Sequence, residues 1–263
     1  MKIAIHGATG RMGRAVARLA GEADDWQIVG ASAAGEDPLL GQDVGEIAGC
    51  GNVGVAVSPD VGGSLLGADV VVDFSIAAAV PNLLNLAAKQ GVAVVSGTTN
   101  IGDAERAALE RAAEKIPVMW AQNMSLGVQV LAELVTEAVR RLGSGFDAEI
   151  VEVHHRNKVD SPSGTAKRLA TAVREARPDI RELHAREGLV GARTDDEVGV
   201  FGVRGGDVIG DHTVHLFGPG ERIELTHRAS NRDLFAHGAI RAARFLPTQK
   251  PGMYAIADVL RGK

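Results

Sequence analysis

Short apolar runs alternate with longer segments of helical periodicity over residues 1–120 of the chain. The runs have the length of buried strands, and between them apolar residues recur every three or four positions, as on one face of a helix. The expected strands are residues 3–6, 27–32, 70–74, 93–96 and 117–120, and the expected helices are 12–22, 77–90 and 104–115. Strands that alternate with helices predict an α/β fold with a Rossmann-type, doubly wound parallel sheet.

This pattern changes after Asn123. A helix is expected over residues 126–142, followed by an alternating strand over 148–153. Residues 198–226 have the pattern of several strands joined by glycine-rich turns, and helical spacing returns over 235–245. We therefore expect two domains, the second of them an α+β insertion.

The composition supports an α/β fold and argues against one class of binding partner. Hydrophobic residues make up 45% of the 263 residues and aromatic ones only 3%, while there are 33 glycines. A core of small aliphatic side chains punctuated by glycine turns suits an α/β protein. The formal charge of −5 argues against nucleic acid as the main partner, because phosphate binding requires a basic surface.

The chain has one cysteine, Cys50, which cannot form an internal disulfide and has no basic neighbour to activate it. The first residues lack the long apolar stretch of a signal peptide, and no run of about 18 apolar residues predicts a membrane span. We therefore expect a cytoplasmic protein that does not bind membranes.

A glycine loop, Gly7–Gly13, joins the first expected strand to its helix with the spacing G-x-x-G-x-x-G. Glycine permits the tight turn and the close approach of a pyrophosphate, and the helix start offers unpaired N–H groups. The loop predicts a dinucleotide site, the alternative being a structural turn without a ligand. Arg11 could assist with a phosphate.

The end of the second strand leaves the choice of dinucleotide open. An acidic residue at this position usually binds the adenosine ribose, but the strand here ends in Ser32-Ala33-Ala34-Gly35. Neither a carboxylate that would repel a 2′-phosphate nor an arginine that would bind one stands there. The pattern is compatible with NADPH or NADH.

The densest group of reactive side chains lies in residues 152–166. Ser161 suits a helix N-cap and Pro162 the first helical position. The N–H groups of Ser163, Gly164 and Thr165 are then expected to be free donors for a carboxylate or phosphate. Lys158, just before them, would add a positive charge, so the run predicts an anion site.

Histidines precede this anion site at the end of the expected strand. Histidine is the side chain best suited to proton transfer near neutral pH, so His154 or His155 could protonate a carbon as a hydride arrives. Lys158 is an alternative donor. The spacing alone does not distinguish these three residues.

A zinc site is the competing interpretation of the histidines. It would use His154 or His155 together with His212, His215 or His227. Cysteine ligands and the H-E-x-x-H spacing are both missing, so we expect no metal. His212 and His215 should point to opposite faces of a strand, and at most one of them can face a given pocket.

At these motifs the chain resembles the dihydrodipicolinate reductase family, also called 4-hydroxy-tetrahydrodipicolinate reductase, of bacterial lysine biosynthesis. The resemblance covers essentially the whole chain, at residues 7–13, 97–99, 121–125, 152–166, 186–188, 204–207, 220–224 and 235–239. It implies hydride transfer from NADPH or NADH to a small cyclic imine dicarboxylate, with loss of a hydroxyl group as water.

The resemblance also implies roles for individual residues. His154 and Lys158 would be catalytic, and substrate would bind to His155, Ser163, Gly164 and Thr165. The residues implied to contact the cofactor are Gly7, Ala8, Thr9, Gly10, Arg11, Met12, Gly97, Thr98, Thr99, Ala121, Gln122, Asn123 and Met124.

The family further implies a homotetramer built through the sheet of the second domain. Residues 1–125, completed by 239–263, would bind the dinucleotide, and residues 126–238 would bind substrate and form the oligomer through a mixed open sheet. Three positions depart from the family pattern: Ala33-Ala34 replaces a common Glu-Arg pair, Asn100 a glycine, and Met124 an aromatic residue.

Two other classes of protein share parts of this pattern: other two-domain dinucleotide oxidoreductases, such as semialdehyde or homoserine dehydrogenases, and non-catalytic NAD(P) sensors. A semialdehyde dehydrogenase needs a positioned cysteine nucleophile, and Cys50 lies in the wrong setting. A homoserine dehydrogenase does not need a histidine pair before an anion-binding helix start. A non-catalytic NAD(P) sensor would have no reason to keep His154, Lys158 and the free N–H donors together.

Overall fold

The computed structural model describes residues 1–262, which form two compact units. Of the described residues, the first unit comprises Met1–Ser125 and residues 233–262, and the second comprises Leu126–Arg232. The helix α8 (Asp233–Phe245) belongs to the first unit from its first residue, rather than from residue 239. Gly238 explains this placement, because a Cβ there would stand 1.7 Å from the carbonyl oxygen of Met124.

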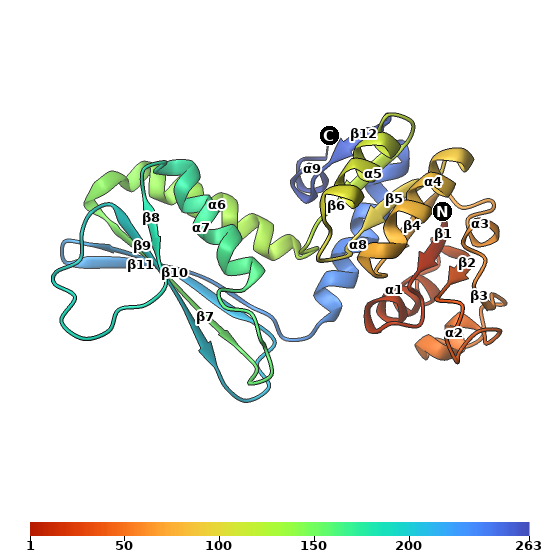
Figure 1. The fold of residues 1–263 in the computed structure, drawn as a ribbon, viewed down its shortest axis with the longest axis horizontal. Coiled ribbons are helices and arrows are strands. Elements are labelled where there is room, and N and C mark those ends of the chain that lie inside the picture. Colours follow the sequence, from red (N-terminus) through yellow and green to blue (C-terminus); the bar gives the residue numbers. More distant parts are fainter. Residues whose placement is uncertain (263) are drawn as a thin grey trace. The chain divides into compact units, whose positions relative to one another are not determined.

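The first unit contains a parallel sheet of seven strands in the order β12-β6-β5-β4-β1-β2-β3 (Figure 1). The strands are β1 (Lys2–His6), β2 (Gln27–Ser32), β3 (Val57–Ser58), β4 (Val70–Asp73), β5 (Ala93–Ser96), β6 (Pro117–Trp120) and β12 (Gly252–Tyr254). The five longer strands match the expected ones. The sequence pattern missed β3 and β12, since two or three residues are too few to show a period.

Helices cover both faces of this sheet, as the expected doubly wound fold requires. On one face, Val71 and Val94 share a core with Leu84 of α4 and Leu109 of α5, while α1 and α8 pack together and contact the sheet. The helices are α1 (Arg11–Gly21), α2 (Val44–Ala48), α3 (Val61–Ser64), α4 (Val80–Gln90), α5 (Asp103–Ala113), α8 and α9 (Ile256–Arg261), with short 3-10 turns at Ala77–Ala79 and Leu246–Thr248.

The strand order reverses at β1, which has β2 on one side and β4 on the other. Doubly wound sheets bind ligands at the carboxyl ends of their strands, beside such a reversal. The glycine loop that follows β1 therefore lies at the position where this architecture places a ligand.

The second unit contains a mixed, open sheet in the order β11-β10-β7-β9-β8. Strands β7, β8 and β9 run parallel, and β10 is antiparallel to both β7 and β11. The strands are β7 (Asp147–His154), β8 (Arg181–Leu183), β9 (Glu197–Arg204), β10 (Asp211–Gly218) and β11 (Glu221–Arg228). The expected α+β domain with a mixed open sheet is confirmed.

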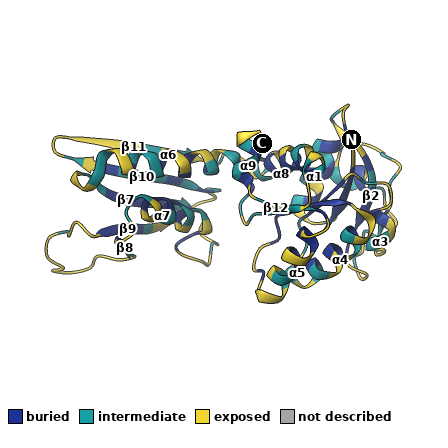
Figure 2. Cartoon of the chain, turned by 90° about the horizontal axis from the view of Figure 1, so that it is seen from above, coloured by how far each residue is buried: buried dark blue, intermediate teal, exposed yellow. Residues whose placement is uncertain are grey.

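The two helices of this unit, α6 (Leu126–Leu142) and α7 (Gly164–Ala176), pack on one face of the sheet, and a 3-10 turn, Gly143–Gly145, follows α6. Residues of both helices form one core with strand residues such as Ile150, Val200 and Val214. Figure 2 shows β11 mostly in the colour of exposed residues, whereas alternate residues of β7 are buried. One face of the sheet is thus covered by helices within the chain.

Of the helices formed by residues 1–262, none combines the length and the apolar character that crossing a membrane requires.

Replacing Gly30 with alanine tests the close packing of β2 on α3. A Cβ at position 30 would stand 1.8 Å from the carbonyl oxygen of Ser64, so the backbone must shift. We expect Gly30→Ala to lower the free energy of unfolding by about 1–3 kcal/mol, the usual cost of overpacking. Urea titration followed by the fluorescence of Trp26 and Trp120 measures it. In the control Gly35→Ala, a Cβ meets nothing within 4 Å, and an equal loss there would contradict the prediction.

Candidate functional site

The loop after β1 has the backbone that close approach to a phosphate requires. Gly7 adopts φ +74°, and a Cβ there would stand 2.7 Å from the carbonyl oxygen of Phe74. At Gly13 a Cβ would meet the carbonyl oxygen of Gly7 at 2.1 Å. Gly10 is the N-cap of α1, so the N–H groups of the first helical turn, beginning at Arg11, have no partner within the helix. This geometry is compatible with the anion-binding loop that the sequence predicts.

A carboxylate that the sequence analysis did not assign supports this loop. Thr9 donates its hydroxyl proton to Asp37 over 2.6 Å, and the other oxygen of Asp37 accepts from the N–H of Leu39. The hydroxyl of Thr9 and the N–H of Leu39 hold the pKa of Asp37 below its ordinary value. Asp37 lies after the end of β2, too late in the sequence to match the usual acidic position.

The loop after β5 is held by a buried carboxylate of the neighbouring strand. Asp73, at the end of β4, accepts hydrogen bonds from the hydroxyls of Ser96 (2.6 Å) and Thr98 (2.9 Å). The ring N–H of Trp120 donates to the carbonyl of Thr98. Asn100 follows with φ 58°, a left-handed conformation that asparagine adopts more readily than other residues with a side chain.

The expected cofactor residues of the third segment, Ala121–Met124, follow β6. The N–H of Ala121 donates to the carbonyl of Ser96, which ties this segment to β5. Met124 is buried, and its carbonyl lies against Gly238 of α8. The three expected cofactor segments thus follow β1, β5 and β6, at the carboxyl edge of one parallel sheet.

In the second unit, strand β7 brings two polar side chains into a row of core residues. Its residues alternate in burial, so that Ala148, Ile150, Glu152 and His154 all face α6 and α7. The last two lie where the apolar core ends. Because residues two apart on a strand share a face, Glu152 and His154 are neighbours.

The carboxylate of Glu152 is fully buried and hydrogen-bonded at both oxygens. One oxygen contacts Nδ1 of His154. The other accepts from the N–H of Ser163 at 3.2 Å and from the guanidinium of Arg204 at 2.8 Å. Burial alone would raise the pKa of Glu152, but Arg204 and His154 hold it below its ordinary value. Glu152 is therefore a carboxylate anion at neutral pH.

Two histidine rings meet beside this carboxylate. The rings of His154 and His212 touch edge to face, with centroids 5.0 Å apart. Burial lowers the pKa of His154, against the attraction of Glu152, and burial with the neighbouring His154 lowers the pKa of His212 to about 4. As expected, His215 points to the opposite face of β10, where it lines a separate hollow.

The start of α7 differs from the sequence expectation. Ser163, not Ser161, is the N-cap, and its hydroxyl accepts from the N–H of Ala166. The N–H of Ser163 is not a free donor, because it binds Glu152. The sequence alone does not show that the hydroxyl of Ser163 reaches the N–H of Ala166, the third residue of the helix. Gly164 and Thr165 are the first two residues of α7, so their N–H groups point out of the start of the helix.

The remaining expected residues lie in the loop between β7 and α7. Lys158 pairs with Asp160 at 2.7 Å and is largely buried. His155 is half-buried, and its Nε2 accepts from Arg232 at 3.4 Å. His154, Lys158 and the start of α7 therefore belong to one short stretch of chain around Glu152.

Glu152, His154 and His212 could also hold a metal ion, because one ligand atom of each lies within 4.8 Å of the others. Both oxygens of Glu152 are already hydrogen-bonded, and the guanidinium of Arg204 touches one of them. A metal cation would meet this positive charge and break the contact with His154. The cluster fits a hydrogen-bonded network better than a metal centre.

Family models match each of the two units of the chain. Residues 1–124 match the model of the dihydrodipicolinate reductase N-terminus, and residues 127–260 match that of the dihydrodipicolinate reductase C-terminus. The chain belongs to the dihydrodipicolinate reductase family. A 4-hydroxy-tetrahydrodipicolinate reductase of Syntrophotalea carbinolica is 44% identical over 99% of this chain and 98% of its own length. One of Methanopyrus kandleri is 46% identical over 99% and 96%.

Solved structures share the fold. A dipicolinate-bound dihydrodipicolinate reductase of a Paenisporosarcina species superposes with a TM-score of 0.78, at 23% identity, over 97% of each chain. An amine dehydrogenase of Mycobacterium smegmatis gives a TM-score of 0.64 at 14% identity, over 97% of this chain and 95% of its own. At these identities the likeness concerns the fold alone.

Several residues around His154 in this reductase-family chain were not assigned from sequence. Arg204 stands opposite His154 in the register of β7 and β9, and His212 stands opposite Glu152 in that of β7 and β10. A Cβ at Gly202 would come within 3.0 Å of Glu152. In the sequence, Arg204 appeared only within the family-like residues 204–207 and His212 only as a possible zinc ligand, because strand pairing is not visible in one chain.

The buried His212 makes the stability of the second unit depend on pH. Its pKa, about 4 in the folded chain, is below the ordinary 6.5. The unfolded chain therefore takes up a proton first, and stability present above pH 6.5 is lost as the pH falls toward 4. The full loss corresponds to about 3 kcal/mol. Between pH 7 and pH 4, we expect the free energy of unfolding of the His212→Gln variant to fall by about 3 kcal/mol less than that of the natural chain.

Hydrogen exchange of peptides from β7 and β10 measures this difference. The variant and the natural chain are compared at the same pH, so the pH dependence of the exchange chemistry itself cancels. The exposed His184 offers the control: His184→Gln should keep the pH dependence of the natural chain. If His212→Gln kept it as well, His212 would not be the group that titrates.

Proposed function

We propose that the chain catalyses the reduction of 4-hydroxy-tetrahydrodipicolinate to tetrahydrodipicolinate, with loss of water, in lysine biosynthesis through diaminopimelate. The observation that carries this proposal is the contact of Glu152 with both His154 and the N-cap of α7. It joins a group that transfers protons to a helix start that attracts carboxylates. Family membership and relatives of that name at 44–46% identity support the same reaction.

The substrate is a cyclic imine with two carboxylates. The first helical N–H groups, at Gly164 and Thr165, would bind one carboxylate, and the ammonium of Lys158 would add a positive charge. His155 lies at the other end of the same loop and would contact the substrate there. Ser163 would act through its backbone, since its hydroxyl caps the helix and its N–H binds Glu152.

Loss of the hydroxyl group as water takes up one proton and releases another from the adjacent ring carbon, and that carbon regains a proton once the neighbouring carbon has received hydride. We assign the proton for the hydroxyl group to Lys158 and the proton returned to the ring carbon to His154. General acid catalysis of this kind contributes about 10²–10⁴-fold to a rate. Lys158 is held by Asp160, which keeps its ammonium close to the loop.

NADH or NADPH supplies the hydride when bound to the first unit. The residues that would hold it are the loop Gly7–Met12, the loop Gly97–Thr99 and the segment Ala121–Met124, all at the carboxyl edge of the sheet. Two observations fit a dinucleotide: a Cβ would clash at Gly7 and Gly13, and the first turn of α1 presents N–H groups without helical partners. The exposed Ala34 leaves room for either cofactor at the end of β2.

The single cysteine, Cys50, is unpaired, and burial raises the pKa of its thiol, so it is a poor nucleophile. An unpaired thiol and the use of NADH or NADPH both suit a reducing compartment. We therefore place the enzyme in the cytoplasm.

Replacing Lys158 with alanine tests the proposed reaction. We expect kcat to fall about 100-fold, with the Kd for NADPH unchanged, because Lys158 lies outside the unit that would bind the dinucleotide. The measurement is the loss of NADPH absorbance with freshly generated substrate. The exposed Lys167 of α7 provides the matched control, Lys167→Ala, which should turn over normally.

Unchanged turnover in Lys158→Ala would remove this residue from the mechanism. A natural chain that binds NADPH but turns over no substrate would instead favour the alternative of a non-catalytic sensor.

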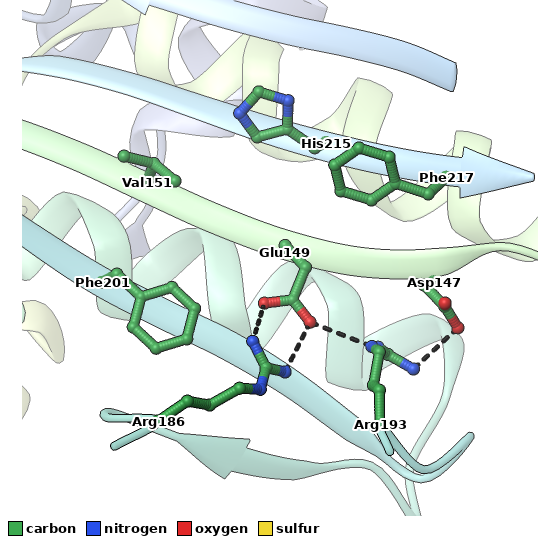
Figure 3. Close-up of a pocket in the computed structure, with 8 residues that line it drawn as sticks. All are labelled: Asp147, Glu149, Val151, Arg186, Arg193, Phe201, His215 and Phe217. Atoms are coloured by element: carbon green, nitrogen blue, oxygen red, sulfur yellow. Dashed lines mark hydrogen bonds and ion pairs between the residues drawn. The ribbon is translucent and has the colours of Figure 1, made fainter. Parts of the chain in front are cut away.

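We further propose that the open face of the second sheet joins four copies of the chain. This face carries a hollow of about 500 Å³, lined by Asp147, Glu149, Val151, Arg186, Arg193, Phe201, His215 and Phe217 (Figure 3). Arg186 and Arg193 both bind Glu149 there, which leaves their charges paired. Phe217 is 38% exposed and Val203 is 49% exposed. A partly apolar, open sheet face of this kind suits the interface of a symmetric homotetramer.

Replacing Phe217 with glutamate tests this assembly, because a charge on the face would be buried without a partner. We expect Phe217→Glu to sediment as smaller species in analytical ultracentrifugation, while the natural chain sediments as a tetramer. The control is Leu134→Glu, on α6, where the leucine is 52% exposed. A tetramer that survives Phe217→Glu, or that Leu134→Glu dissociates equally, would place the interface elsewhere.

A further inference from the structure

The carboxylate of Glu152 is the nearest charged group to His154, and it is completely buried. Both side chains leave β7 on the same face, and one oxygen of Glu152 contacts Nδ1 of His154. The ring of His212 touches the imidazole edge to face, with ring centroids 5.0 Å apart. Two neighbours therefore orient His154. Glu152 forms a hydrogen bond with its ring, whereas His212 makes a ring contact.

The charge of Glu152 decides which ring nitrogen carries a proton. An ionised carboxylate only accepts hydrogen bonds, so Nδ1 of His154 must be the donor in this contact. The nitrogen left for proton transfer is Nε2. A Cβ at Gly210 would stand 2.9 Å from Nε2, so glycine at that position keeps the space around this nitrogen open.

The second oxygen of Glu152 anchors the carboxylate. It accepts from Arg204 of β9 and from the N–H of Ser163, the N-cap of α7. The same carboxylate therefore touches the proposed proton donor and the residue that begins the proposed anion-binding helix. A movement of Glu152 would disturb both.

We propose that Glu152 is a positioning residue: it holds His154 with Nδ1 protonated, so that Nε2 delivers the proton to substrate, and it fixes that ring relative to the start of α7. This inference rests on the proposed function. In the step, the proton on Nε2 of the imidazolium passes to the substrate carbon and leaves a neutral ring that still donates from Nδ1 to Glu152. Glu152 itself neither gains nor loses a proton.

The charges around His154 determine the direction in which its pKa moves when the charge of Glu152 is removed. Burial lowers the pKa of His154, Glu152 raises it, and Lys158 and Arg204 lower it. His212, with a pKa of about 4, is neutral at the pH of the assay. Without the negative charge of Glu152, burial and the two cations would act unopposed, and His154 would lose its proton at a lower pH.

The Glu152→Gln variant removes the charge and keeps the shape. If its amide oxygen faces Arg204 and Ser163, its NH2 group faces Nδ1 and requires that nitrogen to be unprotonated. We expect kcat at neutral pH to fall about 100-fold, with the Kd for NADPH unchanged. The alkaline limb of the kcat profile should move to lower pH, a shift that a purely structural role would not produce.

Nitrogen-15 NMR of the histidine rings gives a readout that needs no turnover. In the natural chain His154 should titrate with Nδ1 protonated in its neutral form. In Glu152→Gln the neutral ring should carry its proton on Nε2 and titrate at lower pH. The same spectra show through the other histidines whether the variant is folded.

Two further variants separate positioning from general electrostatics. Arg204→Met removes a cation that lowers the pKa of His154, so its titration should move to higher pH, opposite to Glu152→Gln. Asp211→Asn is the matched control. Asp211 pairs in register with Val153, beside His154, but its ion pair is with Arg228. Its loss should leave the tautomer and the titration of His154 unchanged.

The proposal is overturned if His154 keeps its tautomer and titration in folded Glu152→Gln, or if Asp211→Asn moves them equally. It is also overturned if kcat and its pH profile are unchanged. If the natural chain turned over no substrate, the proposed reaction would fail, while the NMR comparison would still decide whether Glu152 sets the protonation of His154.

Discussion

A buried carboxylate is costly unless donors surround it, and Glu152 organises the second unit because its donors come from different elements. Arg204 comes from β9, Ser163 from the start of α7, and His154 from the same strand. Each contact satisfies part of the charge, and each fixes the element from which the donor comes. The position of α7 relative to β7 is therefore set by the same carboxylate that orients His154. Packing of the aliphatic core brings β7, β9 and α7 together. The hydrogen bonds of Glu152 then fix the end of β7 against Arg204 of β9 and the start of α7.

The first unit uses the same physical device at a different place. Asp73 is fully buried at the end of β4, and it accepts from the hydroxyls of Ser96 and Thr98 and the N–H of Ser75. These bonds hold the loop after β5 against the end of β4. In both units a carboxylate ends a row of core residues and fixes the loop that would meet a ligand. Loops of this kind need such support because their backbone groups have few partners within secondary structure.

Glycine has a complementary role in both units, because it leaves room where atoms must approach closely. Gly13 lets α1 start against the carbonyl of Gly7, and Gly238 lets α8 lie on the carbonyl of Met124. In the second unit, Gly202 and Gly210 leave room beside Glu152 and His154. A side chain at any of these positions would push apart groups that the proposed chemistry needs close together.

The sequence by itself determined the longer elements of the first unit and predicted the residues of the candidate site. Apolar periodicity located the longer strands of the first unit and the longer helices within a few residues, because burial on a sheet or a helix face imposes a period on the chain. It gave β9, β10 and β11 only as several strands within residues 198–226. It did not find β3 or β12, which are too short for a period. It placed the N-cap of α7 at Ser161 instead of Ser163, because both serines suit the role and only the bond to Ala166 distinguishes them. The partners of His154 were decided by tertiary structure, since strand register, not sequence spacing, brings Arg204 and His212 to Glu152 and His154.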